Sequence, residues 1–393
     1  ISIFTITEGN LTHNISLSNR GGGIRVNEMA PWVGLGWSLN AGVYVTRSIR
    51  GVEDDNINYG YYNGSYFLDP NFLQFTDTQY IDIVQSLGLG LLYDKEPDLF
   101  SFNFNGRNGK FLFDRYGRPN LFPKQSLNIA PVTGQLNEFI ITDEEGTRYY
   151  FGQNGQEKHS INAYNGQGFS LEKKITWFLT RIESANGQDY INFNYNANSQ
   201  EYRNVSSEIN IRRSSNLCYG SYFSNHFNTT HVRGFVLSNI ESNKYTIDFN
   251  YTRDRTDIKS GGVKLNSIVV KNKENIPIKN FNLYTSYFDA PHKGSSRRIH
   301  QNTYNQSDRD TRRLRLDSIQ EYSGTTSKPP YIFNYFENID LPRRLSFAQD
   351  TKGYYNGKGN QKLTPKIPEL KDCSAYVYGN LANRDPSWPH VKA

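Results

Sequence analysis

Apolar and polar residues alternate along most of the chain, and this pattern predicts β-strands. Residues 98–104 place three phenylalanines on one face, residues 105–109 supply a turn with two glycines, and residues 110–114 return with the same alternation. Successive side chains of a strand point to opposite faces, and Asn and Gly favour tight turns, so we expect an antiparallel hairpin here. A second hairpin is predicted over residues 139–151. Helical spacing of apolar residues occurs at residues 78–92.

A unit with the pattern Leu-x-x-Ile, a turn and a strand of large apolar residues recurs from residue 179 onward. Its copies begin at Leu179, Leu237, Leu265 and Leu316. A single two-stranded unit cannot bury its apolar face, whereas units stacked side by side form a continuous sheet. We therefore expect an all-β fold in which successive antiparallel hairpins form a large curved sheet, or the beginning of a β-shell, with polar loop insertions.

These patterns divide the chain into three parts. Residues 1–97 are a glycine- and tryptophan-rich N-terminal segment that we interpret as plug-like. Residues 98–342 form the predicted array of β-hairpins, with polar or basic insertions at 196–233 and 291–315. Residues 343–393 show little regular alternation and are rich in Gly, Pro and Lys, so we expect an irregular connector there.

The composition fits this fold and argues against several classes of protein. Aromatic residues make up 14% of the chain, with 28 Tyr and 24 Phe, which suits half-buried pleated surfaces. The net charge of +6 is small for 393 residues, so we expect no nucleic-acid partner. Cys218 and Cys373 are too few for a disulfide framework. No apolar run is long enough for a membrane span, and the start at Ile1 without a signal pattern indicates a fragment or a processed start.

The sequence contains no arrangement of residues typical of a catalytic or metal site. A metal site at His226 and His231 is disfavoured because structural sites need three or four ligands. Glu53–Asp55 could bind calcium, but a solvated loop is the favoured interpretation. Asp143–Gly146 is better explained as a hairpin turn, and the Gly-x-Ser-x-Gly pattern is absent. We therefore expect a protein that is not an enzyme and that has no cofactor or bound metal.

A basic stretch near residue 300 is the main candidate for a partner-facing surface. Its side chains could grip nucleic acid or an acidic glycan. Interleaved Asp308 and Asp310 dilute the positive potential, so a solvated or partner-facing loop is the favoured interpretation. The residues that we assign to this basic loop are Arg297, Arg298, Arg309, Arg312 and Arg313.

The most distinctive stretch is Val33–Gly42, which reads Val-Gly-Leu-Gly-Trp-Ser-Leu-Asn-Ala-Gly. Its glycines allow the backbone to turn or to approach another segment closely. Trp32 and Trp37 can cover this backbone, and Ser38 and Asn40 can satisfy exposed backbone groups. The glycine spacing does not fit a phosphate-binding loop, so we expect a compact structural motif at a sheet end. The residues of this motif are Gly34, Gly36, Trp37, Asn40, Gly42 and Arg47.

Together with its flanks over residues 23–51, this stretch resembles the N-terminal region of the very large RHS/YD-repeat-like proteins of the Bacteroidota type. Val43 stands where that family commonly has a second glycine. The resemblance implies that residues 343–393 connect to downstream repeats rich in tyrosine and glycine. It continues, in the order of the family, at residues 96–104, 177–182, 353–357 and 382–384.

The resemblance implies a secreted protein, located extracellularly or on the outer-membrane surface. Within a giant exported protein, the chain would be a non-catalytic structural or binding part: a scaffold or shell for a C-terminal effector, or a surface for adhesion. The implied partners are downstream repeats of the same polypeptide and outer-membrane secretion or surface proteins, with export by the type 9 secretion route. The alternative is a carbohydrate-binding module or glycan-active β-protein, since exposed Tyr and Trp can stack on sugar rings. A component or cargo of a secretion complex is a third interpretation.

Overall fold

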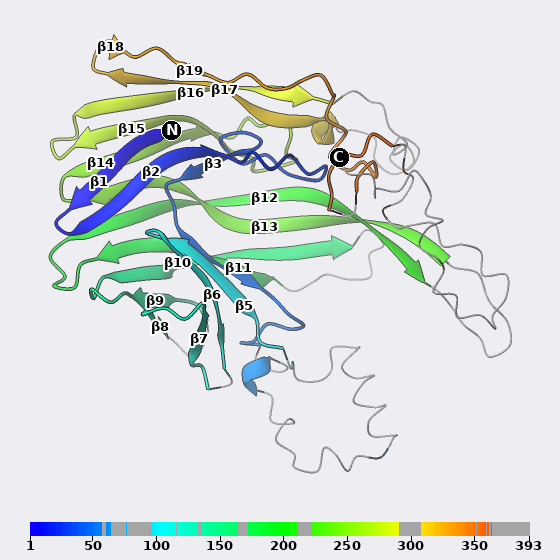
Figure 1. The fold of residues 1–393 in the computed structure, drawn as a ribbon, viewed down its shortest axis with the longest axis horizontal. Coiled ribbons are helices and arrows are strands. Elements are labelled where there is room, and N and C mark those ends of the chain that lie inside the picture. The colour runs from blue at the N-terminus through cyan, green and yellow to red at the C-terminus, as the bar shows by residue number, and fades with distance from the viewer. Residues whose placement is uncertain are drawn as a thin grey trace.

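The computed structural model of the chain is built almost entirely from antiparallel strands (Figure 1). These strands form one small sheet and one large sheet. The structure describes residues 1–56, 60–63, 76, 94, 96–114, 116–132, 136–163, 172–210, 222–290, 308–350, 352–358, 360 and 363.

The small sheet contains three strands in sequence order: β1 (Ser2–Glu8), β2 (Leu11–Asn19) and β3 (Trp37–Asn40). The described residues also include two 3-10 helices, η1 (Tyr61–Asn63) and η4 (Asp308–Asp310). The large sheet has 16 strands. They are β4 (Tyr44–Ser48), β5 (Leu99–Phe104), β6 (Arg107–Phe113), β7 (Pro119–Phe122), β8 (Asn128–Pro131), β9 (Phe139–Thr142), β10 (Arg148–Ala163), β11 (Lys173–Glu183), β12 (Tyr190–Asn210), β13 (Tyr222–Ser242), β14 (Tyr245–Thr252), β15 (Lys264–Asn272), β16 (Pro277–Asp289), β17 (Arg312–Ser323), β18 (Thr326–Ser327) and β19 (Tyr331–Ile332).

Hairpin neighbours account for much of the large sheet. Its path runs β18-β17-β16-β15-β14-β13-β10-β11-β4-β5-β6-β7. Off this path, β12 pairs with β11 and β13, β9 pairs with β10, β8 pairs with β9, and β19 pairs with β17. From β13 to β17 each strand pairs with the next strand in sequence. Strand β4 comes from the predicted segment 1–97, yet it joins the large sheet between β11 and β5. The prediction of an all-β fold with antiparallel hairpins in a large sheet is confirmed.

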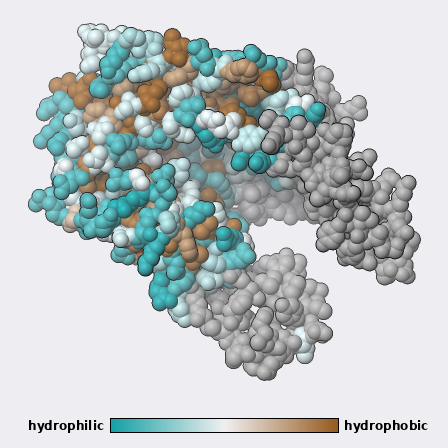
Figure 2. All heavy atoms as spheres, viewed as in Figure 1, coloured by the Kyte–Doolittle hydropathy of each residue, from teal (hydrophilic) through white to brown (hydrophobic). Residues whose placement is uncertain are grey.

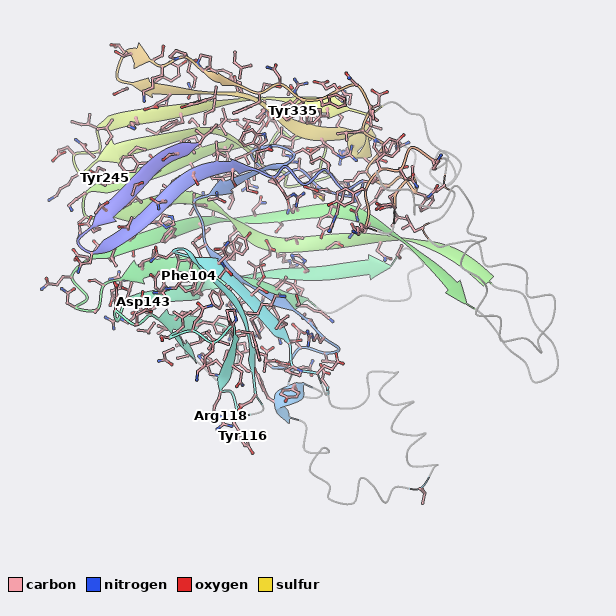
Figure 3. All side chains as sticks on the ribbon, viewed as in Figure 1. Phe104, Tyr116, Arg118, Asp143, Tyr245 and Tyr335 are labelled. Carbon is pink, nitrogen blue, oxygen red and sulfur yellow. The ribbon has the colours of Figure 1, made fainter. Side chains whose placement is uncertain are left out.

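Both hairpins expected from the alternation are present. β5 pairs with β6, and their turn places Asn105 and Gly106 at positive φ values of 47° and 74°. β9 pairs with β10, and the turn between them is closed by Asp143 (Figure 3). The Asp143 carboxylate accepts hydrogen bonds from the backbone N–H groups of Glu145 and Thr147 at 3.0 and 2.9 Å. An Asp side chain that bonds to nearby backbone groups stabilises such a turn.

The recurring Leu-x-x-Ile units supply a continuous core to one face of the large sheet. The fourth unit contributes Leu316 and Ile319 from β17, and its Phe333 packs against the same core. This shared core buries the apolar face that a single two-stranded unit would leave exposed. In the first three units the key apolar residues are at most 6% exposed: Leu179, Ile182, Ile191, Phe193, Leu237, Ile240, Ile247, Phe249, Leu265, Ile268, Phe281 and Leu283.

The small sheet lies across the large sheet, on the side that carries this core (Figure 1). Phe4 of β1 meets Tyr245 of β14 with ring centroids 5.0 Å apart. His13 of β2 meets Phe193 of β12 at the same separation, edge to face. The partly buried His13 ring bonds to the carbonyl of Ala41 at 2.7 Å, and burial lowers its pKa below the ordinary value. The main core therefore lies between the two sheets.

The two segments expected to be insertions, 196–233 and 291–315, differ from each other in the structure. Residues 196–210 and 222–233 lie in β12 and β13, which pair along their length and so extend a hairpin with polar residues. Residues 291–307 lie outside the described residues, whereas residues 308–315 belong largely to η4 and β17. The segment with helical spacing, 78–92, also lies outside the described residues.

Exposed apolar side chains mark both ends of the large sheet. Near β7, Tyr116 and Phe122 are 66% and 54% exposed, and in β19 Tyr331 and Ile332 are 53% and 67% exposed. Elsewhere on the face shown in Figure 2, apolar and polar residues are intermingled. Within the part of the chain that the structure describes, no helix is long and apolar enough to span a membrane.

Candidate functional site

Residues 23–51, which we call the hub segment, contact every other described stretch of the family resemblance. β4 of the hub pairs with β5 from stretch 96–104 and with β11 from stretch 177–182. The backbone N–H of Val26 donates to the carbonyl of Gly353 at 2.8 Å, which brings in stretch 353–357. Residues 382–384 lie outside the described residues. Stretches far apart in the sequence therefore meet around one segment.

Gly34 brings the hub segment directly against β17. Its φ is +124°, and a Cβ added there would lie 2.8 Å from the backbone nitrogen of Leu316. The next residue, Leu35, donates its N–H to the carbonyl of Leu314 at 2.7 Å. A contact of 2.8 Å from Cβ to a backbone atom leaves no space for any side chain, so glycine is required where these backbones touch.

The other residues of the predicted motif have distinct roles. Trp37 is 7% exposed, and its indole N–H donates to the hydroxyl of Tyr335 at 2.9 Å. The Asn40 amide donates to the hydroxyls of two serines on β2, at 3.2 and 3.1 Å, and so bonds side chains instead of the expected backbone groups. Gly36 has a φ of +77°, which favours glycine. The φ of Gly42 is one that any residue can adopt, and a Cβ added to Gly42 would make ordinary van der Waals contacts.

Arg47 is the centre of a buried ion-pair network. Its fully buried guanidinium contacts Asp98 at 2.5 Å and Asp55 at 2.9 Å. Lys174 of β11 contacts the same Asp55 carboxylate at 2.6 Å. Asp54 and Asp98 bond reciprocally, since each carboxylate accepts the backbone N–H of the other residue at 3.0 Å. The network therefore joins the chain after β4, the chain before β5, and β11.

Burial is the main influence on the protonation of this network. Burial, followed by the charge of Asp98, raises the pKa of Asp54 to about 8. Burial also raises the pKa of Asp98, although Arg47 opposes the shift. Burial opposes ionisation of Asp55, but Arg47 and Lys174 outweigh it and lower the pKa of this carboxyl. With a pKa of about 8, Asp54 is mostly protonated at neutral pH, which removes one negative charge from the buried network.

The solvated loop expected at Glu53–Asp55 is wrong. Asp54 is 0% exposed and the Asp55 side chain is 5% exposed. Glu53 accepts the backbone N–H of Lys174 at 3.1 Å. Among the described residues, no group of three or more His, Cys, Asp or Glu could hold a metal ion. These acids instead bond to the two cations and to backbone N–H groups of the network.

A second buried network, the arginine seam, joins the hub segment to the C-terminal half of the sheet. Arg255 forms an ion pair with Asp257 at 2.6 Å, and both side chains are almost fully buried. Arg255 also donates to the carbonyl of Ala30 at 2.9 Å. Arg313, 1% exposed, donates to the carbonyl of Val26 at 2.8 Å. Burial, followed by repulsion from a neighbouring arginine, lowers the pKa of Arg313 to about 10, so it stays a cation at neutral pH.

The arginines assigned to a basic loop are dispersed. Arg297 and Arg298 lie outside the described residues. Arg309 donates to a backbone carbonyl before β15 at 2.5 Å, and Arg312 forms an ion pair with an aspartate of β16 at 2.9 Å. Arg313 points into the arginine seam. The described members of this set therefore hold separate segments of the chain in place.

Sequence reasoning missed several members of both networks. Asp98, Lys174 and Arg255 carry no motif, and the partners of Arg47 are distant in the sequence. The available signal is a charged residue within or beside an apolar strand, such as Arg47 in β4, since buried charges need partners. Three tryptophans, Trp32, Trp37 and Trp177, pack inside the protein.

No protein-family model matches the chain, and no curated protein matches it. Among solved structures, the chain is similar to the N-terminal domain of effector protein SpvB from Salmonella typhimurium strain LT2. That match has a TM-score of 0.33 and 9% sequence identity, and it covers 82% of this chain and 99% of that chain. A similarity of this size has no bearing on function.

Proposed function

We propose that the chain is a non-catalytic structural part of a large exported protein of the RHS/YD-repeat type. It would serve as a scaffold or shell for an effector, or as a surface for adhesion. The observation that carries this proposal is the sheet that grows hairpin by hairpin from β13 to β17 and ends on an apolar edge. Such an edge accepts further strands of the same polypeptide.

The edge strand β19 explains how the sheet could be extended. β17 is paired along its inner side with β16. On its outer side, among the described residues, the hub segment bonds to the Leu314 carbonyl, and the short strands β18 and β19 pair with the C-terminal half of β17. Tyr331 and Ile332 of β19 are more than half exposed. Exposed apolar residues beside free strand edges favour association with another β-structure. Downstream repeats of the same polypeptide are the proposed partner.

The buried networks support a scaffold role. Arg47 and the arginine seam hold the hub segment rigidly across strands from both halves of the sheet. A buried ion pair leaves an uncompensated charge when one partner is removed, so each network penalises separation of the segments that it joins. A rigid, multiply fastened sheet is suited to mechanical or enclosing roles.

Hydrogen exchange tests the extension of the sheet. Exchange would be compared in the present chain and in a longer polypeptide that carries the proposed downstream repeats. We expect backbone amides of residues 326–333 to become protected in the longer polypeptide, with β7 at the opposite end unchanged as the control. Equal exchange of residues 326–333 in both proteins would exclude pairing at this edge.

Export by the type 9 route to the cell surface is a separate proposal that rests on the resemblance. Fractionation of the native bacterium, before and after inactivation of its type 9 translocon, tests it. The protein should be outside the cell or on the outer-membrane surface only when the translocon is active. Unchanged location after inactivation would refute this route without affecting the scaffold role.

A further inference from the structure

A cleft of about 500 Å³ lies where the hub segment meets the outer end of the large sheet. We call it the terminal cleft. Tyr335, labelled in Figure 3, is part of its wall, close to β17. Its lining is drawn from residues 19–24, 35–36, 287–289 and 335–341. The cleft is thus formed by parts of the chain that come together only in the folded protein.

The floor of the terminal cleft is apolar and firmly held. Leu35 belongs to a buried cluster, against which Phe288 packs. Phe288 and Tyr335 meet edge to face, with centroids 5.0 Å apart. The guanidinium of Arg315 lies 5.3 and 5.1 Å from the centroids of these two rings. Rings fixed by a neighbouring cation form a surface that is ready to receive an apolar group.

Two large apolar side chains of this lining are open to solvent. Phe336 is 79% exposed and Ile339 is 65% exposed. Both lie in the segment after β19, which forms no regular strand there. A phenylalanine left so exposed beside a cleft marks a site of contact, because its burial by a ligand removes a large apolar area from water.

The charged residues of the lining indicate which charge a ligand should carry. The lining includes three carboxylates, Asp289, Glu337 and Asp340, against one cation, Arg20. Arg20 is already held by both carboxylate oxygens of Glu28, at 2.5 and 2.6 Å. Asp289 and Glu337 have ion-pair partners, yet their side chains remain 67% and 56% exposed. Asp340 is exposed and has no ion-pair partner among the described residues.

We propose that the terminal cleft binds an extended segment of a partner protein in which a large apolar side chain stands next to Lys or Arg. The apolar side chain would be buried against Phe336 and Ile339, and the cation would pair with Asp340. An acidic segment would be repelled by Asp340, whose charge is balanced by no cation among the described residues, so this carboxylate gives the site its preference for a basic segment. This proposal does not depend on the scaffold role, because it concerns residues after β19 and not the edge of β19.

Fluorescence anisotropy with a labelled synthetic peptide, Gly-Lys-Phe-Lys-Ile-Lys-Gly, tests the proposal on the whole chain. We expect this peptide to bind at least about tenfold more tightly than its counterpart with Glu in place of each Lys. Phe336→Ala should weaken binding about tenfold or more, as for a central aromatic contact. Asp340→Asn should weaken it about two- to fivefold and reduce its dependence on salt. Phe122→Ala, an exposed phenylalanine at the opposite end of the sheet, is the matched control and should change nothing.

Several results would overturn this assignment. One is failure of the basic peptide to bind, or equal binding of the two peptides. Another is an equal loss of binding in Phe122→Ala and Phe336→Ala. Displacement of the peptide by cellohexaose, with the same response to Phe336→Ala, would assign the cleft to a sugar instead. Thermal melting of all three variants should match the parent chain, since each altered side chain is exposed, so a loss of binding reports on the cleft and not on folding.

Discussion

Replacement of Gly34 by alanine tests the close contact between the hub segment and β17. The alanine would have to adopt φ near +124°, where its Cβ would lie 2.8 Å from the backbone nitrogen of Leu316 and 3.1 Å from its Cβ. A residue held in a sparsely populated backbone region costs about 1–3 kcal/mol. The clash is with backbone, which cannot rotate away, and overpacking of this kind costs about 1–3 kcal/mol more. We therefore expect Gly34→Ala to lower the free energy of unfolding by about 2–6 kcal/mol.

Two other glycines provide matched controls. Gly106 has φ +74° with no atom of the described residues within 4 Å of an added Cβ, so Gly106→Ala should cost only the backbone term of about 1–2 kcal/mol. Gly21 has ordinary φ and equally open surroundings within the described structure, so Gly21→Ala should change stability by no more than about 0.5 kcal/mol. Urea unfolding followed by tryptophan fluorescence measures all three, with midpoints compared at unchanged slope. A loss in Gly34→Ala no larger than that in Gly106→Ala would show that this contact does not fasten the hub segment.

Three further predictions concern the buried polar groups. Arg47→Met should lower the free energy of unfolding by about 3–5 kcal/mol in urea, because it leaves the buried Asp98 without its cation; a loss under about 1 kcal/mol would contradict a buried pair. Trp37→Phe and Tyr335→Phe should show a coupling energy of about 0.5–1.5 kcal/mol in a double-mutant cycle, since the indole N–H donates to the phenol oxygen, and additive losses would argue against this bond. The pKa of Asp54, raised to about 8 in the folded state, means that the folded protein binds this proton more tightly than the unfolded chain does. The stability contributed by Asp54 is therefore greatest at low pH and falls as the pH rises from about 4 to about 8, by at most about 1.4 kcal/mol per pH unit. Asp54→Asn should flatten the decline measured by urea unfolding between pH 5 and pH 8, and an unchanged slope would count against the raised pKa.

Local pattern was sufficient for the all-β fold class, for the two hairpins at residues 98–114 and 139–151, and for the apolar face of the repeated units. Phe100, Phe102 and Phe104 alternate with polar residues, and the structure buries all three on one face of β5. The Leu-x-x-Ile units likewise predicted both the hairpins and the buried face. This works because strand periodicity is a local property: side chains two residues apart share a face in any sheet. The sequence pattern was misleading at Glu53–Asp55. Three consecutive acidic residues suggest a loop exposed to solvent, but Arg47 and Lys174 pair with Asp55 and so allow this segment to be buried.

The amino-acid pattern was enough to predict the fold class, the principal hairpins, the apolar face of the repeated units and the glycine-rich stretch. Which segments contact one another became evident only in the folded chain. Arg47 and Asp98 are 51 positions apart, and Arg313 bonds to a carbonyl 287 positions away. The terminal cleft similarly combines residues near position 20 with residues near position 340. Ion pairing and the lining of a cleft depend on distances in space, and these are set by the pairing order of all the strands together.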